Sequence, residues 1–481
     1  MSNGHAPTST EIRNEADDKD LVSSLNQELT LTSALPANKN CSIYKVPDNL
    51  KAANENAYVP RLVSVGPFHN GSKNLQAMQD QKWIYLKSLL SRHQSSMSSN
   101  DGSSLSSPTV DLTFVQSLKR LEKRARESYS ETFNKLSSNA FVEMMILDGC
   151  FIIELFIRHR TVMEKSHGRE VVDSDPLFTT PRLHSCLAWD LILLENQLPL
   201  FVLEHLVSLN QLREINININ INQEPSTFLK ELALDFFQHR SVVPKTSFGH
   251  HQQQHLDSSN HLLDLLRNSL LGSSRPSAHV TISRAEDRQK EDRSMIPSAK
   301  ELSFAGIYIK KGTNDNPFNV IFKCNTRVLE IPPLSIIEDL SNPLLPNLVA
   351  FEQCRSDCPT SEFTSYACLM LNIMKDADGV RFLSKRGIIN QLPGHDEEVV
   401  LLLKKICSGV TFPRNFHFSD LYDQLNKYFH SITTEWVYIL RTQYFENPGT
   451  IITITNAAMV LILAVIQTFF TALPYIKKHP S

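Results

Sequence analysis

Residues 140–157 read AFVEMMILDGCFIIELFI and are apolar at almost every position. Only Glu143, Asp148 and Glu154 carry a charge within this stretch. A helix that is apolar on nearly every face is buried in a protein core, because it leaves no face for water. The stretch therefore predicts a central helix around which the rest of the chain packs, and a mainly α-helical fold.

The sequence on both sides of this central helix has the spacing expected of further helices. Apolar residues recur at steps of three and four, which places them on one face of a helix. This spacing predicts helices at residues 75–90, 111–129, 183–194, 200–209, 227–239, 261–271, 336–340, 345–353, 363–374, 397–407 and 418–445. Three short alternating or β-branched stretches, residues 305–311, 318–323 and 328–331, predict a small antiparallel β-sheet instead.

The composition excludes several classes of protein. Hydrophobic residues make up 41% of the 481 residues and charged residues 21%, which excludes a chain disordered throughout and a polytopic membrane protein. The 48 basic and 51 acidic residues give a net charge of -3, so we expect no nucleic acid partner. Eight cysteines are too few for a disulfide framework. Cys150, Cys186 and Cys368 lie in apolar runs and are predicted to be small buried residues.

The C-terminal end has the properties of a membrane anchor. Ile451 to Leu473 reads IITITNAAMVLILAVIQTFFTAL and contains no charge over 23 residues. At 1.5 Å per residue such a helix spans about 35 Å, more than the roughly 30 Å hydrocarbon core of a bilayer. Lys477 and Lys478 follow as basic anchors. We therefore predict a single-pass transmembrane helix held by membrane lipid, in the plasma membrane or the endoplasmic reticulum. A buried core helix is the alternative.

These features divide the chain into four parts. Residues 1–40 are polar, lack the apolar stretch of a secretory signal and predict a disordered leader. Residues 41–446 are expected to form one large helical domain. Residues 447–474 contain the transmembrane helix with its flank, and residues 475–481 form a short basic tail.

Three polar runs inside the helical domain predict flexible loops. They lie near residues 91–108, 215–225 and 272–297. The second run contains a strict Ile-Asn alternation at residues 215–222. A low-complexity insert in a loop is the favoured interpretation, and an edge strand, which has the same period of two, is the alternative.

No motif of a known chemistry is present. The glycine-rich fingerprints for dinucleotides and phosphates, the Gly-x-Ser-x-Gly of hydrolases and the His-Glu-x-x-His of zinc proteases are all absent. The densest group of histidines comprises His250, His251, His255 and His261. It lies in a Gln-rich run without helical spacing. Cys354 and Cys358 are four residues apart, but no second ligand pair follows them. We therefore predict no metal and no cofactor.

Three carboxylates are the strongest candidates for catalysis. Asp148, Asp190 and Glu195 lie among apolar residues, where burial can raise the pKa of a carboxyl and suit it to general acid or base catalysis. Buried carboxylates more commonly cap helices or accept hydrogen bonds from buried donors. The structural role is favoured, because no nucleophile–base pair accompanies them, and we predict no catalytic residue.

Several long motifs occur together in this sequence and in one plant family. They are IYKVPDNLKAANENAYVPRLVSVGPFHNG (43–71), Lys82-Trp83, FVEMMILDGCFIIELF (141–156), DLILLENQLPLFVLEHL (190–206), HLLDLLR (261–267), SAKELSFAGIYIKK (298–311), LVAFEQC (348–354) and YFENP (444–448). In this order they resemble the plant domain-of-unknown-function 247 family, over about Cys41 to Leu473. The chain departs from the family at Gly449, where an aromatic residue is common, and in the Ile-Asn insert.

The resemblance implies a mostly helical plant protein with one C-terminal membrane span and no established enzymatic activity. Some members of the family are associated with self-incompatibility recognition. We therefore expect a non-catalytic, membrane-anchored plant protein that acts in recognition or signalling through protein–protein interaction. The alternative is an enzyme with an unrecognised buried carboxylate site. Neither the protein partner nor the oligomeric state follows from the sequence.

Overall fold

The computed structural model of the chain describes residues 22–24, 26, 41–97, 109–166, 175–209, 224–239, 256–272, 296–313, 318–333, 341–355, 361–389, 394–412, 416–429 and 448–478. Most of the predicted leader at residues 1–40 lies outside these ranges. So do the predicted helix at 336–340, the Ile-Asn run at 215–222, and most of the predicted loop near 272–297.

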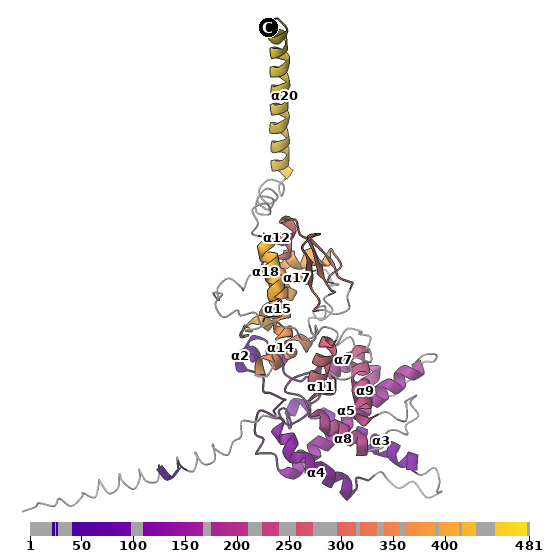
Figure 1. Ribbon diagram of the computed structural model, residues 1–481. Helices are drawn as coiled ribbons and strands as arrows, with labels where there is room; N and C mark the ends of the chain where they lie inside the picture. The colour runs from indigo at the N-terminus through magenta and orange to yellow at the C-terminus, as the bar shows by residue number, and fades with distance from the viewer. Residues whose placement is uncertain are drawn as a thin grey trace, which may run out of the picture.

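Helix α5 (Ser138–Ser166) lies at the centre of the N-terminal lobe, residues 73–272 (Figure 1). Between Phe141 and Ile157 only Glu143 is exposed, so the predicted core helix is confirmed. Gly149 lets α8 (Leu200–Leu209) approach closely, since a Cβ atom there would lie 2.3 Å from Leu206 Cδ1.

Three further helices pack on α5 beside α8. They are α3 (Ala77–Met97), α4 (Leu112–Glu127) and α9 (Pro225–His239). Helix α4 begins where the Asp111 carboxylate accepts the Phe114 amide at 2.6 Å. Helix α3 continues to Met97, so the first part of the loop predicted at 91–108 is helical. The prediction was wrong there because polar composition alone does not distinguish a loop from the end of a helix.

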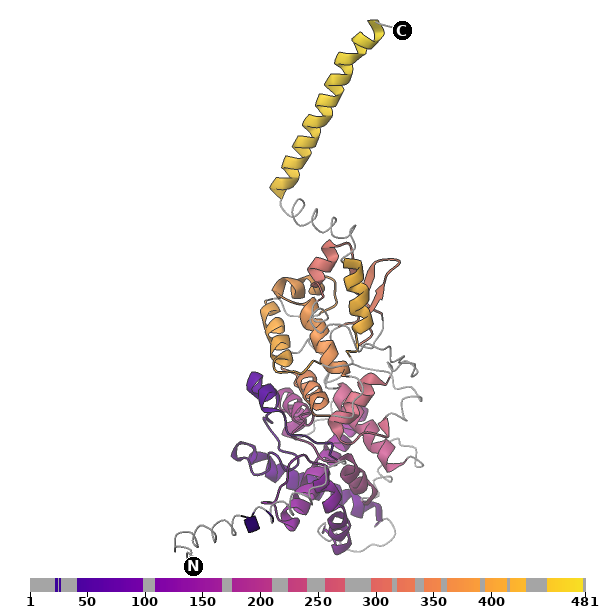
Figure 2. The same cartoon turned by 60° about the vertical axis from the view of Figure 1, so that its left-hand side comes forward.

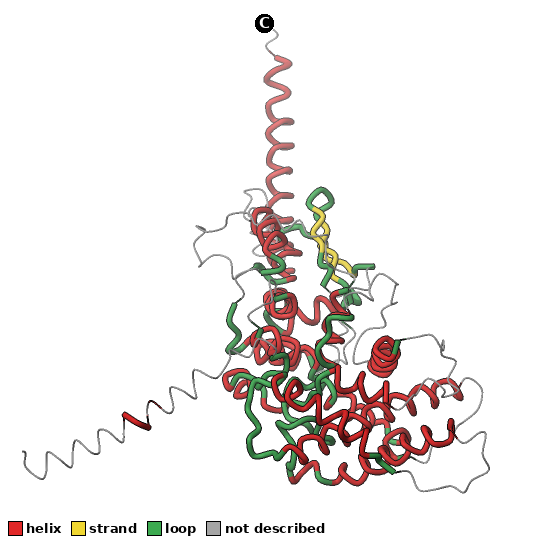
Figure 3. The backbone as a smooth tube through the Cα atoms, turned by 60° about the horizontal axis from the view of Figure 1, so that its bottom comes forward, coloured by secondary structure: helices red, strands yellow, loops and turns green. Residues whose placement is uncertain are grey.

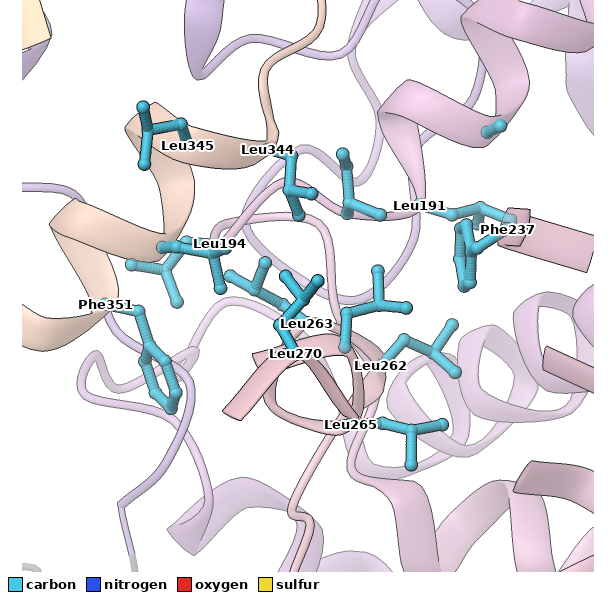
Figure 4. Packing of buried hydrophobic residues seen from close by; sticks show 14 of the residues in the cluster. Leu191, Leu194, Phe237, Leu262, Leu263, Leu265, Leu270, Leu344, Leu345 and Phe351 are labelled. Atoms are coloured by element: carbon cyan, nitrogen blue, oxygen red, sulfur yellow. The ribbon is translucent and has the colours of Figure 1, made fainter. Parts of the chain in front are cut away.

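The next layer is formed by α6 (Pro176–Thr179), α7 (Pro181–Asp190) and α11 (Leu262–Leu271). Figure 4 shows Leu262, Leu263 and Leu265 of α11 packed among leucines of the turn at 191–199 and of α14 (Leu344–Cys354). This apolar layer joins the two halves of the molecule.

Helix α7 ends four residues earlier than the predicted helix at 183–194. The side chains of the following turn take the carbonyl groups that a longer helix would use. Asn196 Nδ2 donates to the Asp190 carbonyl at 2.9 Å, and Gln197 Nε2 donates to the Leu191 and Leu193 carbonyls at 2.8 Å each. Polar side chains that bind nearby backbone compete with helix in this way.

The C-terminal lobe, residues 296–429, is a separate group of helices above the N-terminal lobe in Figures 1 and 2. Its helices are α12 (Ala299–Phe304), α14, α15 (Glu362–Ile373), α16 (Ala377–Ser384), α17 (Asp396–Cys407) and α18 (Ser419–Phe429). Helix α17 packs against both α15 and α16, and α14 contacts α11 of the N-terminal lobe.

The C-terminal lobe also carries the small sheet, which forms a minor element of the helical molecule (Figure 3). Its strands are β1 (Tyr308–Lys311), β2 (Ile321–Lys323) and β3 (Val328–Ile331), in the order β1-β3-β2. Strands β2 and β3 form the predicted antiparallel pair, but β1 runs parallel to β3. The sheet is therefore mixed rather than antiparallel. The pattern of residues identified the strands but not their order in the sheet. The last strand, β3, lies between β1 and β2, which form the two edges.

The chain enters the fold through residues 41–72, here called the N-terminal segment. It contains helix α2 (Asp48–Ala53) and the short 3-10 turn η1 (Glu55–Ala57). Its only described strand-like pairing is the isolated bridge between Ile43 and Tyr129 of the N-terminal lobe. At the other lobe, Asn49 Nδ2 donates to the Gly409 carbonyl at 2.7 Å. The segment therefore ties both lobes together, and most of its backbone needs partners other than a sheet.

Helix α20 (Pro448–Lys478) extends away from both lobes (Figures 1 and 2). Within it, Ile451–Thr471 is long and apolar enough to cross a membrane, with a mean hydropathy of 2.0 and no buried residue. The predicted stretch at Ile451–Leu473 is thus helical throughout. The alternative of a buried core helix does not agree with this exposure, because nothing in the described chain covers Ile451–Thr471.

Candidate functional site

The three candidate carboxylates are all buried in the interior. Asp148 is on α5, Asp190 ends α7, and Glu195 lies in the turn that follows. With Asn196 and Gln197 of the same turn they form a group of five buried polar residues, here called the polar centre. All three carboxylates that the sequence singled out thus bind the backbone of one segment, residues 41–72. Four of the five side chains bind backbone of the N-terminal segment.

Asp190 and Asn196 bind the backbone of residues 61–65. The Asp190 carboxylate accepts the amides of Arg61, Leu62 and Val63 at 2.9, 2.6 and 2.8 Å. Asn196 accepts the Val65 amide at 2.6 Å and donates to the Val63 carbonyl at 3.0 Å. A buried extended segment without a sheet partner leaves its amides unsatisfied unless side chains bind them. Here Asp190 and Asn196 take the place of a neighbouring strand.

Asp148 forms a buried ion pair with Lys82 of α3. The Lys82 ammonium lies 2.5 Å from Asp148 Oδ1, and the two side chains are only 2% and 4% exposed. The same ammonium donates to the Ser64 carbonyl at 2.7 Å, while Asp148 Oδ2 accepts the Gly66 amide at 2.9 Å. The pair therefore holds the segment at two neighbouring backbone positions.

Gly66 is the point where the N-terminal segment comes closest to the polar centre. Its φ of +72° is a conformation that favours glycine, and a Cβ atom there would lie 2.4 Å from the Gln197 carbonyl oxygen. The Tyr129 hydroxyl donates to that same carbonyl at 3.1 Å. A side chain at position 66 would therefore push the N-terminal segment away from the turn that contains Gln197.

Glu195 binds the other end of the N-terminal segment. Its carboxylate accepts the Val46 amide at 2.9 Å and lies 3.0 Å from the Lys51 ammonium. The His69 ring is 3.4 Å from the same carboxylate. All three partners belong to the segment, so Glu195 fastens it at both sides of α2.

The environment moves the pKa values of these carboxyls in different directions. Burial raises the pKa of Asp190 to about 6, although three backbone amides oppose the shift. Burial also raises the pKa of Asp148, against the opposing charge of Lys82. Burial acts in the same direction on Glu195, but the nearby His69 ring and hydrogen bonds from the Val46 amide and Lys51 outweigh it, and its pKa is lowered.

The raised pKa of Asp190 predicts a pH dependence of stability. A carboxyl with a higher pKa in the folded state binds its proton more tightly there, so protonation stabilises the fold. The contribution of Asp190 therefore falls as the pH rises from its ordinary value of 3.8 through about 6. Relative to Asp190→Asn, the wild-type protein should gain about 1 kcal/mol of unfolding free energy between pH 7.5 and pH 5.

Thermal or urea unfolding of both proteins at the two pH values measures this difference. Other titrating groups are common to both proteins and cancel in the comparison. An Asp190→Asn protein whose stability relative to wild type is the same at both pH values would contradict the raised pKa.

Asn347 of α14 links the polar centre to the C-terminal lobe. Its amide nitrogen donates to the Ala57 carbonyl of the N-terminal segment at 2.7 Å. Its amide oxygen accepts the Leu194 amide, in the turn of the polar centre, at 2.9 Å. One side chain thus connects α14, the segment and the turn. Sequence patterns assigned no role to Asn347, and the only signal for it was an amide inside the apolar stretch at 344–351.

Glu352, also on α14, caps the start of α15. Its carboxylate accepts the Phe363 and Thr364 amides at 3.1 and 2.8 Å. Arg267 of α11 lies 3.1 Å from Glu362 and 4.0 Å from Glu352. Burial raises the pKa of Glu352 to about 7, against the charge of Arg267. Glu352 and Arg267 thus connect α11, α14 and the start of α15.

A further buried charge network lies between α3 and α5. Glu154 is fully buried and lies 3.1 Å from Arg92 and 2.8 Å from Arg158. Arg158 also lies 2.9 Å from Asp175, which accepts the Tyr85 hydroxyl at 2.7 Å. The two arginines come from separate helices, and their meeting at Glu154 was not evident from the sequence.

Only one of the four histidines between residues 250 and 261 lies in the described part of the chain. His250, His251 and His255 lie outside the described residues, and His261 is buried at the start of α11. Its Nδ1 accepts the Asp264 amide at 3.3 Å, and burial lowers its pKa to about 4. His261 therefore acts as a helix cap.

Within the described ranges, no three His, Cys, Asp or Glu side chains lie close enough to hold a metal ion. The Cys354 thiol lies 3.7 Å from the Lys45 carbonyl of the N-terminal segment, and Cys358 lies outside the described residues.

Comparison with known proteins gives a consistent assignment. The family model DUF247, described as "Plant protein of unknown function", matches residues 43–463. A UPF0481 protein of Arabidopsis thaliana is 29% identical over 479 residues, covering 95% of this chain and 92% of the relative. A putative UPF0481 protein of the same plant is 20% identical over 506 residues and covers 89% of each chain. No solved structure matches significantly.

Proposed function

The chain belongs to the DUF247 family of plant proteins of unknown function, and from this premise we propose that it is a non-catalytic protein. In this proposal α20 anchors the protein in a membrane. The protein acts in recognition or signalling by binding another protein. The polar centre, in this proposal, holds the two lobes in one arrangement. The anchor fixes that arrangement at a membrane surface.

The exposure of α20 is the observation that carries the proposal. All of Ile451–Thr471 is uncovered, and bulky residues such as Leu461 and Phe470 are 67% and 66% exposed. A continuous apolar surface of this size is unfavourable in water, and lipid would cover it. The helix satisfies its own backbone groups, as a membrane requires.

The threonines of α20 support the same conclusion. The hydroxyls of Thr453, Thr455, Thr468 and Thr471 each donate to the carbonyl four residues earlier, at 2.7 to 2.8 Å. A hydroxyl bonded within its own helix leaves no unsatisfied donor for hydrocarbon. These four threonines are therefore compatible with a lipid environment.

The bonding of the carboxylates supports the non-catalytic part of the proposal. Asp190 is 1% exposed, and its two oxygens already accept three backbone amides. A general acid or base must reach a proton on a substrate within hydrogen-bond distance. The oxygens of Asp190 face the protein's own chain, as do those of Asp148 and Glu195.

Two exposed residues of α3 support the recognition part. Trp83 and Ile84 are 50% and 54% exposed, directly after the buried Lys82. Exposed tryptophans of this kind are enriched among the residues that carry the energy of protein interfaces. Lys82 thus fixes the helix from inside, while its neighbours offer an apolar surface to a partner.

The alternative of an enzyme rests on the pKa of Asp190, because a value of about 6 also suits a general acid. Two variants separate the alternatives in plants that lack the gene. Asp190→Asn should still complement the loss of the gene, because the amide oxygen can accept the Leu62 and Val63 amides, although the Arg61 amide loses its acceptor. Trp83→Ala with Ile84→Ala should fail to complement this loss, since both residues are exposed and their loss leaves the core intact.

Protein level and membrane location must be checked for each variant by immunoblot of membrane fractions. An Asp190→Asn protein that is stable and membrane-bound but inactive would favour the enzyme. A fully active Trp83→Ala, Ile84→Ala protein would remove α3 as the contact surface.

A further inference from the structure

Two amide side chains differ from the other polar residues of α20. Asn456 and Gln467 are both exposed within the apolar stretch Ile451–Thr471. The four threonines of this stretch bond to their own helix, but neither amide side chain has a hydrogen-bond partner within the described residues. An amide group carries two donor hydrogens and one acceptor oxygen. Helix α20 therefore presents unsatisfied polar groups as well as an apolar surface.

The depth of the two amides makes a partner necessary, and this step rests on the membrane anchor proposed above. Ile451–Thr471 is 21 residues long and is centred on Leu461. Asn456 and Gln467 lie five and six residues from this centre, or about 7.5 and 9 Å along the helix. Half of the hydrocarbon core is about 15 Å thick. Both amides thus lie inside the hydrocarbon, where an unpaired polar group is unfavourable.

Both amides lie on one face of the helix. They are eleven residues apart, which is close to three turns of 3.6 residues. Six residues follow one another along this face at steps of three, four, three, four and three. They are Thr453, Asn456, Val460, Leu463, Gln467 and Phe470. All six are exposed, and we call them the seam. Their spacing is that of the a and d positions through which two helices of a coiled coil meet.

A second copy of α20 matches the seam. Two copies inserted in the same orientation are parallel, so a two-fold axis along the membrane normal places each seam residue opposite the same residue of the other copy. Because an amide both donates and accepts, two identical amides can hydrogen-bond to each other. Asn456 and Gln467 would then be paired at the same time. The helix of a different protein would need polar side chains at both of these depths to do the same.

We propose that α20 pairs in the membrane with α20 of a second copy of this chain, as a parallel coiled coil with Asn456 and Gln467 hydrogen-bonded across the seam. Val460 and Leu463 pack between the two amide pairs. Polar residues at seam positions fix the register and the number of helices in a coiled coil. Helices in membranes associate through packing and through hydrogen bonds of this kind, mostly at the crossing angle of a left-handed coiled coil.

Sedimentation equilibrium of the purified full-length protein in density-matched detergent micelles tests this pairing. We expect the wild-type protein to be in equilibrium between monomer and dimer. Asn456→Leu with Gln467→Leu should raise the dissociation constant of the dimer by about tenfold or more, because both interhelical amide pairs are lost. Thr468→Leu is the matched control. It removes a polar side chain beside the seam whose hydroxyl already bonds to the Ala464 carbonyl, so the dissociation constant should not change.

Carbonate extraction of membranes carrying the same variants separates pairing from anchoring. Leucine is more favourable in a membrane than an amide, so every variant should stay in the pellet and a lost dimer cannot result from a lost anchor. Wild-type protein that stays in the pellet but is monomeric in micelles would overturn the pairing alone, and would assign the amides to the helix of a different protein. A dimer that persists undiminished in the double leucine variant would also overturn it. Wild-type protein in the carbonate supernatant would overturn both the pairing and the anchor.

Discussion

Replacement of Lys82 by methionine is expected to lower the free energy of unfolding by about 3 to 5 kcal/mol, the usual cost of removing one partner from a buried ion pair. Methionine fills most of the same space but carries no charge. Asp148 then loses its counter-ion and must either hold an unpaired buried charge or bind a proton, and the Ser64 carbonyl loses its donor. A loss of this size is a large part of the total stability of a typical domain.

Two further variants separate this effect from a general change in α3. Lys87→Met removes an exposed lysine from the same helix and should change stability by less than about 0.5 kcal/mol. Adding Asp148→Asn to Lys82→Met removes the unpaired charge while keeping an acceptor for the Gly66 amide, and should recover part of the loss. Urea unfolding monitored by circular dichroism measures all three. A Lys82→Met protein as stable as the Lys87→Met protein would contradict the role of the polar centre.

Replacement of Leu461 and Val465 by arginine should release the protein from membranes. The two residues lie one helical turn apart and are 67% and 60% exposed, so both charges would face the lipid. A central arginine costs about 2.5 to 3.5 kcal/mol of insertion free energy, or roughly 5 to 7 kcal/mol for two. Each favourable residue of this stretch contributes only about -0.3 to -0.6 kcal/mol. Two arginines are therefore sufficient to make insertion of α20 into the membrane unfavourable.

Fractionation of plant cells expressing each form measures the release. Lys477→Ala, which lies beyond the apolar stretch, is the matched control and should stay with the membranes. Gel filtration of the released double variant distinguishes soluble protein from aggregate. If the variant with both arginines stayed bound to membranes without aggregating, the proposed role of α20 as the membrane anchor would be contradicted.

Much of the helical fold could be predicted because local sequence determines it. The stretch at 140–157 is apolar on nearly every face and forms the buried centre of α5, and α8 begins and ends where its spacing indicated. The same reasoning found the three strands but not their arrangement, since pairing of β1 with β3 depends on the path of the connecting chain. Local spacing also placed the end of α7 too late, because Asn196 and Gln197 stop the helix through their side chains.

The candidate site could be predicted only in part. The sequence singled out Asp148, Asp190 and Glu195, and their burial among apolar residues is confirmed. Their partners are backbone amides more than 80 residues away in the chain, at the N-terminal segment. No spacing rule relates positions so far apart. Lys82 was visible only as part of a family motif.

Cys368 shows the same limit of local patterns. It was predicted to be a small buried residue because it lies in an apolar run, but it is partly exposed. The exposure of a side chain depends on how its helix packs against the others. Sequence spacing within one helix carries no information on that packing.

Alkaline carbonate extraction of membranes that carry the unmodified protein tests the central claim most directly. At high pH, peripheral proteins dissociate and integral proteins remain in the lipid, because only the latter are held by the hydrophobic effect. The proposal predicts that the full-length protein stays in the membrane pellet and dissolves only when detergent is added. Recovery of the protein in the carbonate supernatant would contradict an anchor formed by Ile451–Thr471.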